Sequence, residues 1–270
     1  MIDLKDTTFI IPVRIESEDR LRNVITSLCF LLDNFDTSVI LKEVDSVSVF
    51  ERDALPQIKN FLGDKTSNII HLFEQSGDPV FYRMRYINEM LNRVTTEVVS
   101  NYDADVLLPI SSIVSSQQMI MSGEYDVVYP YGWGMWQRKI PPSDELVSEF
   151  LSNDSDFKVF KGKYEPDRAE SGHVQFMRTS SYIEAGMENE NFIAYAPEDK
   201  ERFHRFNKLG YNVGRIDNYV YHLEHGRTQN SWLTNPYMRS NNELWEYLQG
   251  MNENTLRKYY STQKYLKKYK

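Results

Sequence analysis

The sequence predicts an α/β protein with a mainly parallel central sheet flanked by helices. Short β-branched runs alternate with amphipathic stretches in the first hundred residues, which is typical of βαβ units. The run TTFIIPV (7–13) predicts a buried strand, and apolar residues at helical spacing follow it from Leu21 to Leu32. Ser17 is placed to cap this helix. A chain of 270 residues is long enough for one such domain with a large core.

The same alternation continues up to an acidic triplet. We expect strands at 38–44, 68–73 and 95–102 and helices at 54–62 and 80–94. The last of these strands stops at Asp103-Ala104-Asp105. Because ligands collect outside the carboxyl ends of strands in doubly wound sheets, this triplet is a candidate binding site.

The second half of the chain is less regular. Residues 110–170 show no clear period, so we expect mobile connecting structure there rather than a second domain. Glycine and proline signals then predict further elements, namely a short helix closed by Gly186, a helix running from Pro197 to Gly210, a strand at 212–223, and C-terminal helices at 241–250 and 252–269.

Composition argues against several classes of protein. A net charge of −8 disfavours a general nucleic-acid binder, and the single Cys29 excludes an intramolecular disulfide and a cysteine zinc cluster. No apolar run approaches the roughly 20 residues that span a bilayer, and the N-terminus has no secretion signal, so we expect a soluble, cytoplasmic protein. The lysine-rich segment 264–270 predicts a solvated helix end, with weak contact to an anionic membrane face as the alternative.

Two clusters contain residue types that bind metal ions. Asp103 and Asp105 could direct two carboxylates at one hard divalent cation, although such triplets are also common in solvated turns. His222 and His225 follow the predicted strand, and imidazole together with carboxylate suits manganese or a similar metal. A histidine pair of this spacing can equally be structural.

A third acidic cluster, Glu198-Asp199, begins the helix at 197–210. Carboxylates are stabilised at helix N-termini, so simple capping would explain the pair. The alternative is a general base that accepts a proton from a substrate hydroxyl. The residue pattern does not separate these two roles.

Several motifs together resemble the β-1,4-galactosyltransferase family. They are FIIPVR (9–14), EQSGDPVFYRMRYINEML (74–91), NYDADVLLP (101–109), the region 172–215 and YHLEHGR (221–227). The resemblance implies a GT-A type nucleotide-diphospho-sugar transferase fold over 1–270. It divides the chain into a nucleotide-binding half (1–109), an acceptor and catalytic half (110–227) and C-terminal helices (228–270).

The resemblance implies a donor site for a UDP-sugar. Pro12, Val13 and Arg14 would line the uridine pocket. Arg83 would face the diphosphate or the sugar, and Gly172 would lie beside the sugar. The chain departs from the family pattern at 173, where histidine replaces a second glycine, and at 195–197, where Tyr-Ala-Pro replaces Trp-Gly-Gly.

The resemblance also implies a metal site for Mn²⁺ or Mg²⁺. Asp105 and His225 match the family's direct ligands, and Asp103 would lie nearer the ribose or bind through water. His222 stands where relatives have methionine, so its role as a second nitrogen ligand is inferred from chemistry alone.

The activity implied is inverting transfer of a hexose or N-acetylhexosamine, with galactose or N-acetylgalactosamine favoured. Asp199 would be the catalytic base and Glu198 would touch the acceptor. The partners would be a UDP-sugar and a carbohydrate or glycolipid acceptor in bacterial surface polysaccharide or glycolipid synthesis, which would allow peripheral contact at the inner face of the membrane. The aromatic segment 129–139, with Trp232 and Tyr237, would form an acceptor platform or seal the core.

Two other classes of function remain open. One is a catalytically inactive protein that binds sugar nucleotides. The other is a metal-dependent hydrolase of nucleotide sugars or a nucleotidyltransferase, in which the same Asp and His residues would activate water or bridge phosphates. The sequence contains neither a P-loop nor an HExxH motif, which argues against the latter class.

Overall fold

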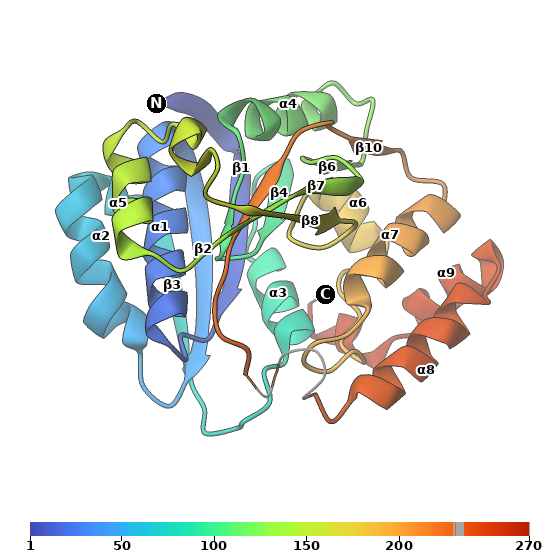
Figure 1. The fold of residues 1–270 in the computed structure, drawn as a ribbon. Coiled ribbons are helices and arrows are strands. Elements are labelled where there is room, and N and C mark those ends of the chain that lie inside the picture. Colours follow the sequence, from blue (N-terminus) through green and yellow to red (C-terminus); the bar gives the residue numbers. More distant parts are fainter. Residues whose placement is uncertain (229, 231–234, 270) are drawn as a thin grey trace.

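A seven-stranded sheet forms the centre of the computed structural model, which describes residues 1–228, 230 and 235–269 (Figure 1). The strand order is β10-β6-β9-β4-β1-β2-β3, and all neighbours are parallel except β9, which runs antiparallel to β4 and β6. The strands are β1 (Ile2–Val13), β2 (Phe35–Asp45), β3 (Ile69–Gln75), β4 (Val98–Tyr102), β6 (Val127–Tyr129), β9 (Val174–Arg178) and β10 (Val213–Arg215). The predicted α/β class with a mainly parallel sheet is confirmed.

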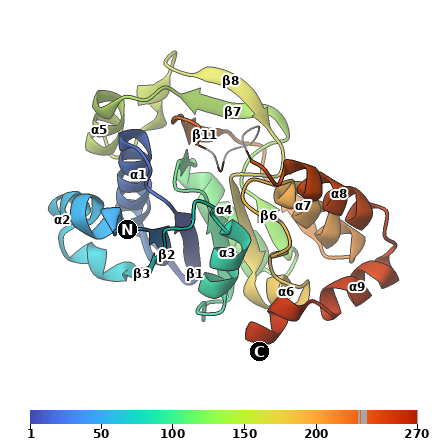
Figure 2. The ribbon, with the colours of Figure 1, turned by 90° about the horizontal axis from the view of Figure 1, so that it is seen from below.

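A second, four-stranded sheet has the order β5-β11-β7-β8 (Figure 2). Its strands are β5 (Val106–Leu107), β7 (Gly134–Ile140), β8 (Glu165–Ala169) and β11 (Val220–Leu223). β11 pairs parallel with β7 and antiparallel with β5. Because β4 ends at Tyr102 and β5 begins at Val106, the chain passes from one sheet to the other across the acidic triplet.

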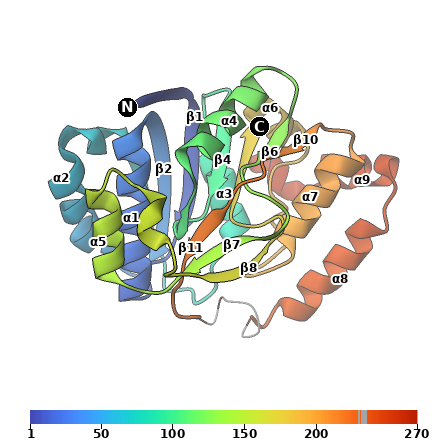
Figure 3. The ribbon, with the colours of Figure 1, turned by 45° about the horizontal axis from the view of Figure 1, so that its top comes forward.

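Helices flank the sheets, with α1, α2 and α5 on the side of β2 and β3 and α6 to α9 at the opposite end (Figures 2 and 3). They are α1 (Glu18–Asn34), α2 (Leu55–Leu62), α3 (Arg83–Leu91), α4 (Ile110–Met121), α5 (Asp144–Ser152), α6 (Thr179–Glu184), α7 (Glu198–Lys208), α8 (Met238–Gln249) and α9 (Glu253–Ser261). Ser17 caps α1 as predicted, because its side chain accepts a hydrogen bond from the Arg20 amide.

Buried side chains form a continuous cluster that extends from Leu4 in β1 to Tyr260 in α9. Phe9, Ile10 and Ile11 are fully buried in succession, as expected for a parallel strand covered on both faces. Cys29 is a free thiol on α1 and is buried in this cluster. No helix in the described part of the chain combines the length and the apolar character needed to cross a membrane.

The expectation of mobile connecting structure over 110–170 is wrong. This segment contains two helices and three strands, α4, α5, β6, β7 and β8. Few residues of the two strands β7 and β8 are buried, namely Gln137 and Ile140 in β7 and Ala169 in β8. These strands are stabilised by pairing with each other and with β11, and such pairing leaves little periodic pattern in their own residues.

The prediction of one strand over 212–223 is also wrong. The segment contains two strands, β10 and β11, which belong to different sheets. Between them the chain turns, and the Ile216 amide donates a hydrogen bond to the Tyr129 carbonyl at 2.9 Å. A continuous β-branched and aromatic pattern cannot show that a chain changes sheets part-way.

The last helix is shorter than the predicted 252–269, and the residues after it are more buried than expected. α9 ends at Ser261, and a 3₁₀ turn follows at Lys264–Lys268. Tyr265 is 5% exposed, and the Lys268 ammonium lies 3.1 Å from a Glu190 carboxylate oxygen. The segment is therefore packed against the fold and is not a solvated, fraying helix end.

Candidate functional site

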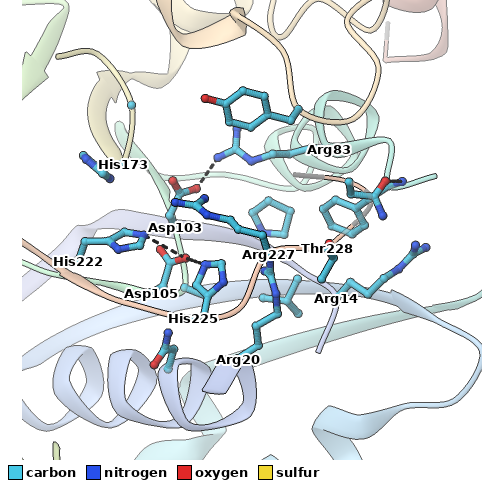
Figure 4. A pocket seen from close by; sticks show the side chains of 18 of the residues that line it. Arg14, Arg20, Arg83, Asp103, Asp105, His173, His222, His225, Arg227 and Thr228 are labelled. Atoms are coloured by element: carbon cyan, nitrogen blue, oxygen red, sulfur yellow. Dashed lines mark hydrogen bonds and ion pairs between the residues drawn. The ribbon is translucent and has the colours of Figure 1, made fainter. Parts of the chain in front are cut away.

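A cavity of about 470 Å³ lies where β1 and β4 end and the smaller sheet begins (Figure 4). All the site residues predicted from the sequence line it, namely Pro12, Val13, Arg14, Arg83, Asp103, Asp105, Gly172, Glu198, Asp199, His222 and His225. They come from strands β1 and β11, helices α3 and α7, and the segments that follow β4, β8 and β11. The fold therefore gathers residues that are up to about two hundred positions apart.

Asp105, His222 and His225 each offer a ligand atom, and these atoms all lie within 4.8 Å of one another. The His225 Nε2 is 3.0 Å and the His222 Nε2 is 3.6 Å from the same Asp105 oxygen. On the far side of its ring, His222 Nδ1 is 2.8 Å from a Glu224 oxygen, which orients the imidazole as a ligand requires. A donor set of one oxygen and two nitrogens fits a first-row divalent metal.

The charges in this group support one another. Burial alone would raise the pKa of Asp105, but the positive charge of His222 and the hydrogen bond with His225 hold it below its ordinary value. Burial would lower the pKa of His222, yet Asp105 and Glu224 raise it. A divalent cation bound here would compete with protonation of His222.

Asp103 lies outside this three-residue group and pairs instead with Arg83. The guanidinium of Arg83 lies 2.5 Å from Asp103 Oδ1 and 3.2 Å from Glu198 Oε1, so it joins the end of β4 to the start of α7. Burial, together with the charges of Asp105 and Asp199, raises the pKa of Asp103 to about 6 in spite of Arg83. The two aspartates of the triplet thus have different surroundings.

Glu198 and Asp199 project into the cavity from the first turn of α7. Burial, and then the charge of Asp199, raises the pKa of Glu198 to about 8. Gly172 lies against Asp199, since a Cβ at position 172 would come within 3.1 Å of Asp199 Oδ2. Space beside this carboxylate therefore depends on glycine.

Asp199 is held by a residue that the sequence analysis did not identify. Arg202 has a fully buried side chain, and its guanidinium lies 2.8 Å from Asp199 Oδ1 and 2.7 Å from Glu188 Oε1. It also donates a hydrogen bond to Gln175 Oε1. The spacing of three between Asp199 and Arg202 on a helix was the available signal, because such residues share a face.

Arg14 forms part of the cavity wall through contacts with the backbone. Its guanidinium donates hydrogen bonds to the carbonyls of Val44, Pro79 and Asp78 at 2.9, 3.0 and 3.1 Å. It also lies 5.4 Å from the centre of the Phe81 ring. Arg14 thereby fixes the segment that precedes α3, a role that the sequence pattern did not reveal.

Two further cations line the cavity near Asp105, His222 and His225, namely Arg20 on α1 and Arg227 after β11 (Figure 4). Arg20 Nε is buried and has no hydrogen-bond partner within the described ranges, and its nearest carboxylate, on Glu16, is 3.9 Å away. This arrangement suits an anionic ligand.

The aromatic residues of the segment 129–139 are divided between the core and the surface. Trp136 packs on Tyr219 with ring centres 4.9 Å apart, whereas Trp133 is 47% exposed. Tyr195 lines the cavity and is 46% exposed, and Tyr237 is half-buried. The other candidate platform residue, Trp232, lies outside the described residues.

No protein-family model matches the sequence, and no curated protein matches it either. Solved structures do match. The mannosyltransferase PcManGT from Pyrobaculum calidifontis, in complex with GDP-Man and Mn²⁺, is 13% identical with a TM-score of 0.55, over 97% of this chain and 69% of that one. Residues 1–349 of S. aureus TarS are 14% identical with a TM-score of 0.50, over 82% of this chain. The match spans 60% of that TarS chain.

At these identities the similarity establishes the fold. The chain has a GT-A type fold. The predicted fold class is confirmed.

Proposed function

We propose that this protein is a metal-dependent glycosyltransferase that moves a hexose or N-acetylhexosamine from a UDP-sugar to a carbohydrate or glycolipid hydroxyl. The observation that carries the proposal is a single cavity, in a GT-A type fold, that holds Asp105, His222 and His225 together with the buried Glu198 and the half-buried Asp199. The similarity to PcManGT, whose structure contains GDP-Man and Mn²⁺, supports a nucleotide-sugar donor and a divalent metal.

In this proposal Asp105, His222 and His225 would hold Mn²⁺, or Mg²⁺, and Asp103 would lie nearer the ribose. When bound, the cation neutralises charge on the diphosphate leaving group. Arg20 and Arg227 lie near these three residues and would bind the phosphate oxygens that the cation does not contact.

Asp199 would act as the base. Arg202 binds its Oδ1, and the other oxygen, Oδ2, faces Gly172 in the cavity, where it can accept the proton of an acceptor hydroxyl. The deprotonated oxygen then attacks the anomeric carbon in one inverting displacement without a covalent enzyme intermediate. Glu198, whose pKa is about 8, is neutral at pH 7 and can donate a hydrogen bond to the acceptor.

The finer assignments rest on the motifs. The resemblance to β-1,4-galactosyltransferases supports galactose or N-acetylgalactosamine as the sugar and Pro12, Val13 and Arg14 as walls of the uridine pocket, at the end of β1. The same resemblance supports a role in bacterial surface polysaccharide or glycolipid synthesis. It also supports a single domain made of a nucleotide-binding half (1–109), an acceptor and catalytic half (110–227) and C-terminal helices (228–270).

The metal site is tested by Asp105→Ala. Release of UDP from UDP-galactose and UDP-N-acetylgalactosamine, or of GDP from GDP-mannose, is measured with sugar acceptors in manganese, magnesium or EDTA. We expect turnover only with metal and a fall of at least about 100-fold in Asp105→Ala, because the carboxylate is the shared centre of the donor set. Asp64→Ala, an exposed site outside the cavity lining, should leave turnover unchanged.

Three results would redirect the assignment. Full activity of Asp105→Ala with an unchanged metal requirement would remove the metal site. Nucleotide binding without turnover of any donor would indicate a binding protein, and donor consumption that does not depend on acceptor would indicate a hydrolase.

A further inference from the structure

We propose that His173 recognises a hydroxyl group of the transferred sugar and so determines which donor is used, an inference that rests on the proposed glycosyl transfer. His173 follows Gly172 at the start of β9 and lines the cavity. Its ring centre lies 5.7 Å from that of His222, a member of the metal-ligating group. The imidazole therefore borders the space where the reaction would take place.

The position of the sugar follows from the two ends of the cavity. If the diphosphate lies at Asp105 and His222 and the anomeric carbon faces Asp199, the sugar ring must lie between them. Gly172 contacts the Asp199 side, and the neighbouring His173 contacts the His222 side. The His173 carbonyl also accepts a hydrogen bond from the Asp103 amide at 3.1 Å, which fixes its backbone to the acidic triplet.

The backbone at His173 is strained. Its φ angle is +64°, in the left-handed region that glycine adopts at little cost and other residues rarely adopt. Such strain is typically kept where a side chain is needed in one place. The requirement here is an imidazole in the cavity wall, because glycine would satisfy the backbone alone.

The hydrogen bond of His173 defines what its free nitrogen can bind. Nε2 lies 3.1 Å from Gln137 Oε1, and a carbonyl oxygen only accepts, so Nε2 carries the proton. Nδ1 is then an acceptor, and it has no hydrogen bond to any residue that the structure describes. An acceptor in the wall of a sugar site requires a donor, and a sugar hydroxyl provides one. Sites built to bind a hydroxyl discriminate strongly against ligands that lack it in that place.

Three variants separate the ring from the strain. His173→Ala removes the imidazole and keeps the strained backbone, whereas His173→Gly removes both. Asp154→Gly is the matched control, because Asp154 is exposed, lies outside the cavity lining and has a φ of +52°. Each protein is titrated in manganese with UDP, UDP-galactose, UDP-glucose, their N-acetyl counterparts and GDP-mannose, and its melting temperature is recorded.

We expect both His173 variants to bind the preferred nucleotide sugar about tenfold more weakly and to lose most of the preference between epimers, with affinity for UDP unchanged. His173→Gly should melt about 2 °C higher than His173→Ala, because glycine relieves the backbone strain. For the same reason Asp154→Gly should melt about 2 °C higher than the native protein. Asp154→Gly should bind all ligands as the native protein does.

The inference would be overturned if both His173 variants kept the preference between epimeric nucleotide sugars. It would also be overturned if they bound UDP as much more weakly as they bind the nucleotide sugars. Either result would leave the proposed function standing. If the native protein bound none of the nucleotides with manganese, the proposed function itself would fail, and the role of His173 with it.

Discussion

Arg202 and Arg205 are both fully buried arginines on α7, yet they face different parts of the molecule. Arg202 binds the cavity residue Asp199 and the buried Glu188. Arg205 lies 3.1 Å from Glu201 and donates a hydrogen bond to the Ala185 carbonyl, away from the cavity lining. The pair therefore distinguishes a residue that positions the proposed base from one that only supports the fold.

We expect Arg202→Lys and Arg205→Lys to destabilise the protein by similar amounts, about 3 kcal/mol each, because lysine cannot reproduce a buried guanidinium fork. Arg202→Lys alone should lower kcat by about 100-fold with little change in the donor KM, since Asp199 loses its fixed orientation. Thermal melts and steady-state kinetics measure the two effects. Equal kcat values in the two variants would show that Arg202 has no positioning role.

Glu198 predicts a pH dependence of stability. Its pKa is raised to about 8 from an ordinary value of 4.5, so its contribution to stability is fully present below about pH 4.5 and is lost as pH rises through 8. Glu198→Gln imitates the neutral form, so the free energy of unfolding of the native protein relative to this variant should fall between pH 5 and pH 9, by up to a few kcal/mol. Urea titrations at several pH values test this, and parallel pH profiles would contradict it.

At the scale of elements, α6 and α9 meet at a glycine. Gly186, just after α6, has a φ of +101°, and a Cβ there would approach Tyr260 of α9 to 2.5 Å. Tyr260 cannot move aside easily, because it is 3% exposed and its hydroxyl lies 2.5 Å from Glu201 Oε1. The sequence predicted Gly186 as a helix end, and the structure adds its contact with a helix seventy residues later.

Gly186→Ala should therefore cost more than the same change at a glycine with a similar backbone and free space. Gly123, after α4, has a φ of +81°, and a Cβ added there would meet nothing within 4 Å. We expect a loss of about 1 kcal/mol for Gly123→Ala from backbone strain, and about 3 kcal/mol for Gly186→Ala, in which the clash is added. Urea denaturation measures both, and equal losses would mean that α9 shifts without cost.

Elements were predictable where one face or both faces of a long segment are buried. The run from Leu21 to Leu32 has enough turns to show its period, and β1 is buried on both sides. Strands β7 and β8 were missed because few of their residues are buried, and they are stabilised by pairing with each other.

At the scale of the whole molecule, the two sheets are joined by a continuous buried cluster that includes β1, β11 and α9. The C-terminal helices belong to it, since Leu248 and Leu256 are fully buried. This arrangement supports the proposal that 1–270 is one domain.

A single domain should unfold in a single transition. We expect the urea midpoints measured by far-UV circular dichroism and by tryptophan fluorescence to coincide, because the buried cluster contains residues from both halves of the chain and from the C-terminal helices. Two separate transitions, for example one for the segment after residue 227, would contradict the proposal and place a domain boundary there.

The sequence by itself determined the class of fold and a set of residues that all line one cavity. It did so because burial on a strand or helix leaves a local period, and because strand ends and helix starts are marked by acidic residues, glycine and proline. On those grounds the acidic clusters at 103–105 and 198–199 were candidates, each with a structural alternative, whereas Pro12, Val13, Arg14, Arg83 and Gly172 came from the family resemblance.

Only the tertiary structure decided which of these residues meet. Asp105 and His225 are 120 positions apart and lie 3.0 Å from each other, whereas Asp103, two positions from Asp105, pairs with Arg83. Contacts between distant segments depend on how two sheets pack, which no local period records. The same packing places the strained His173 in the cavity wall beside Gln137 and His222. Its proposed role in recognising a sugar hydroxyl depends on these contacts, which the sequence does not show.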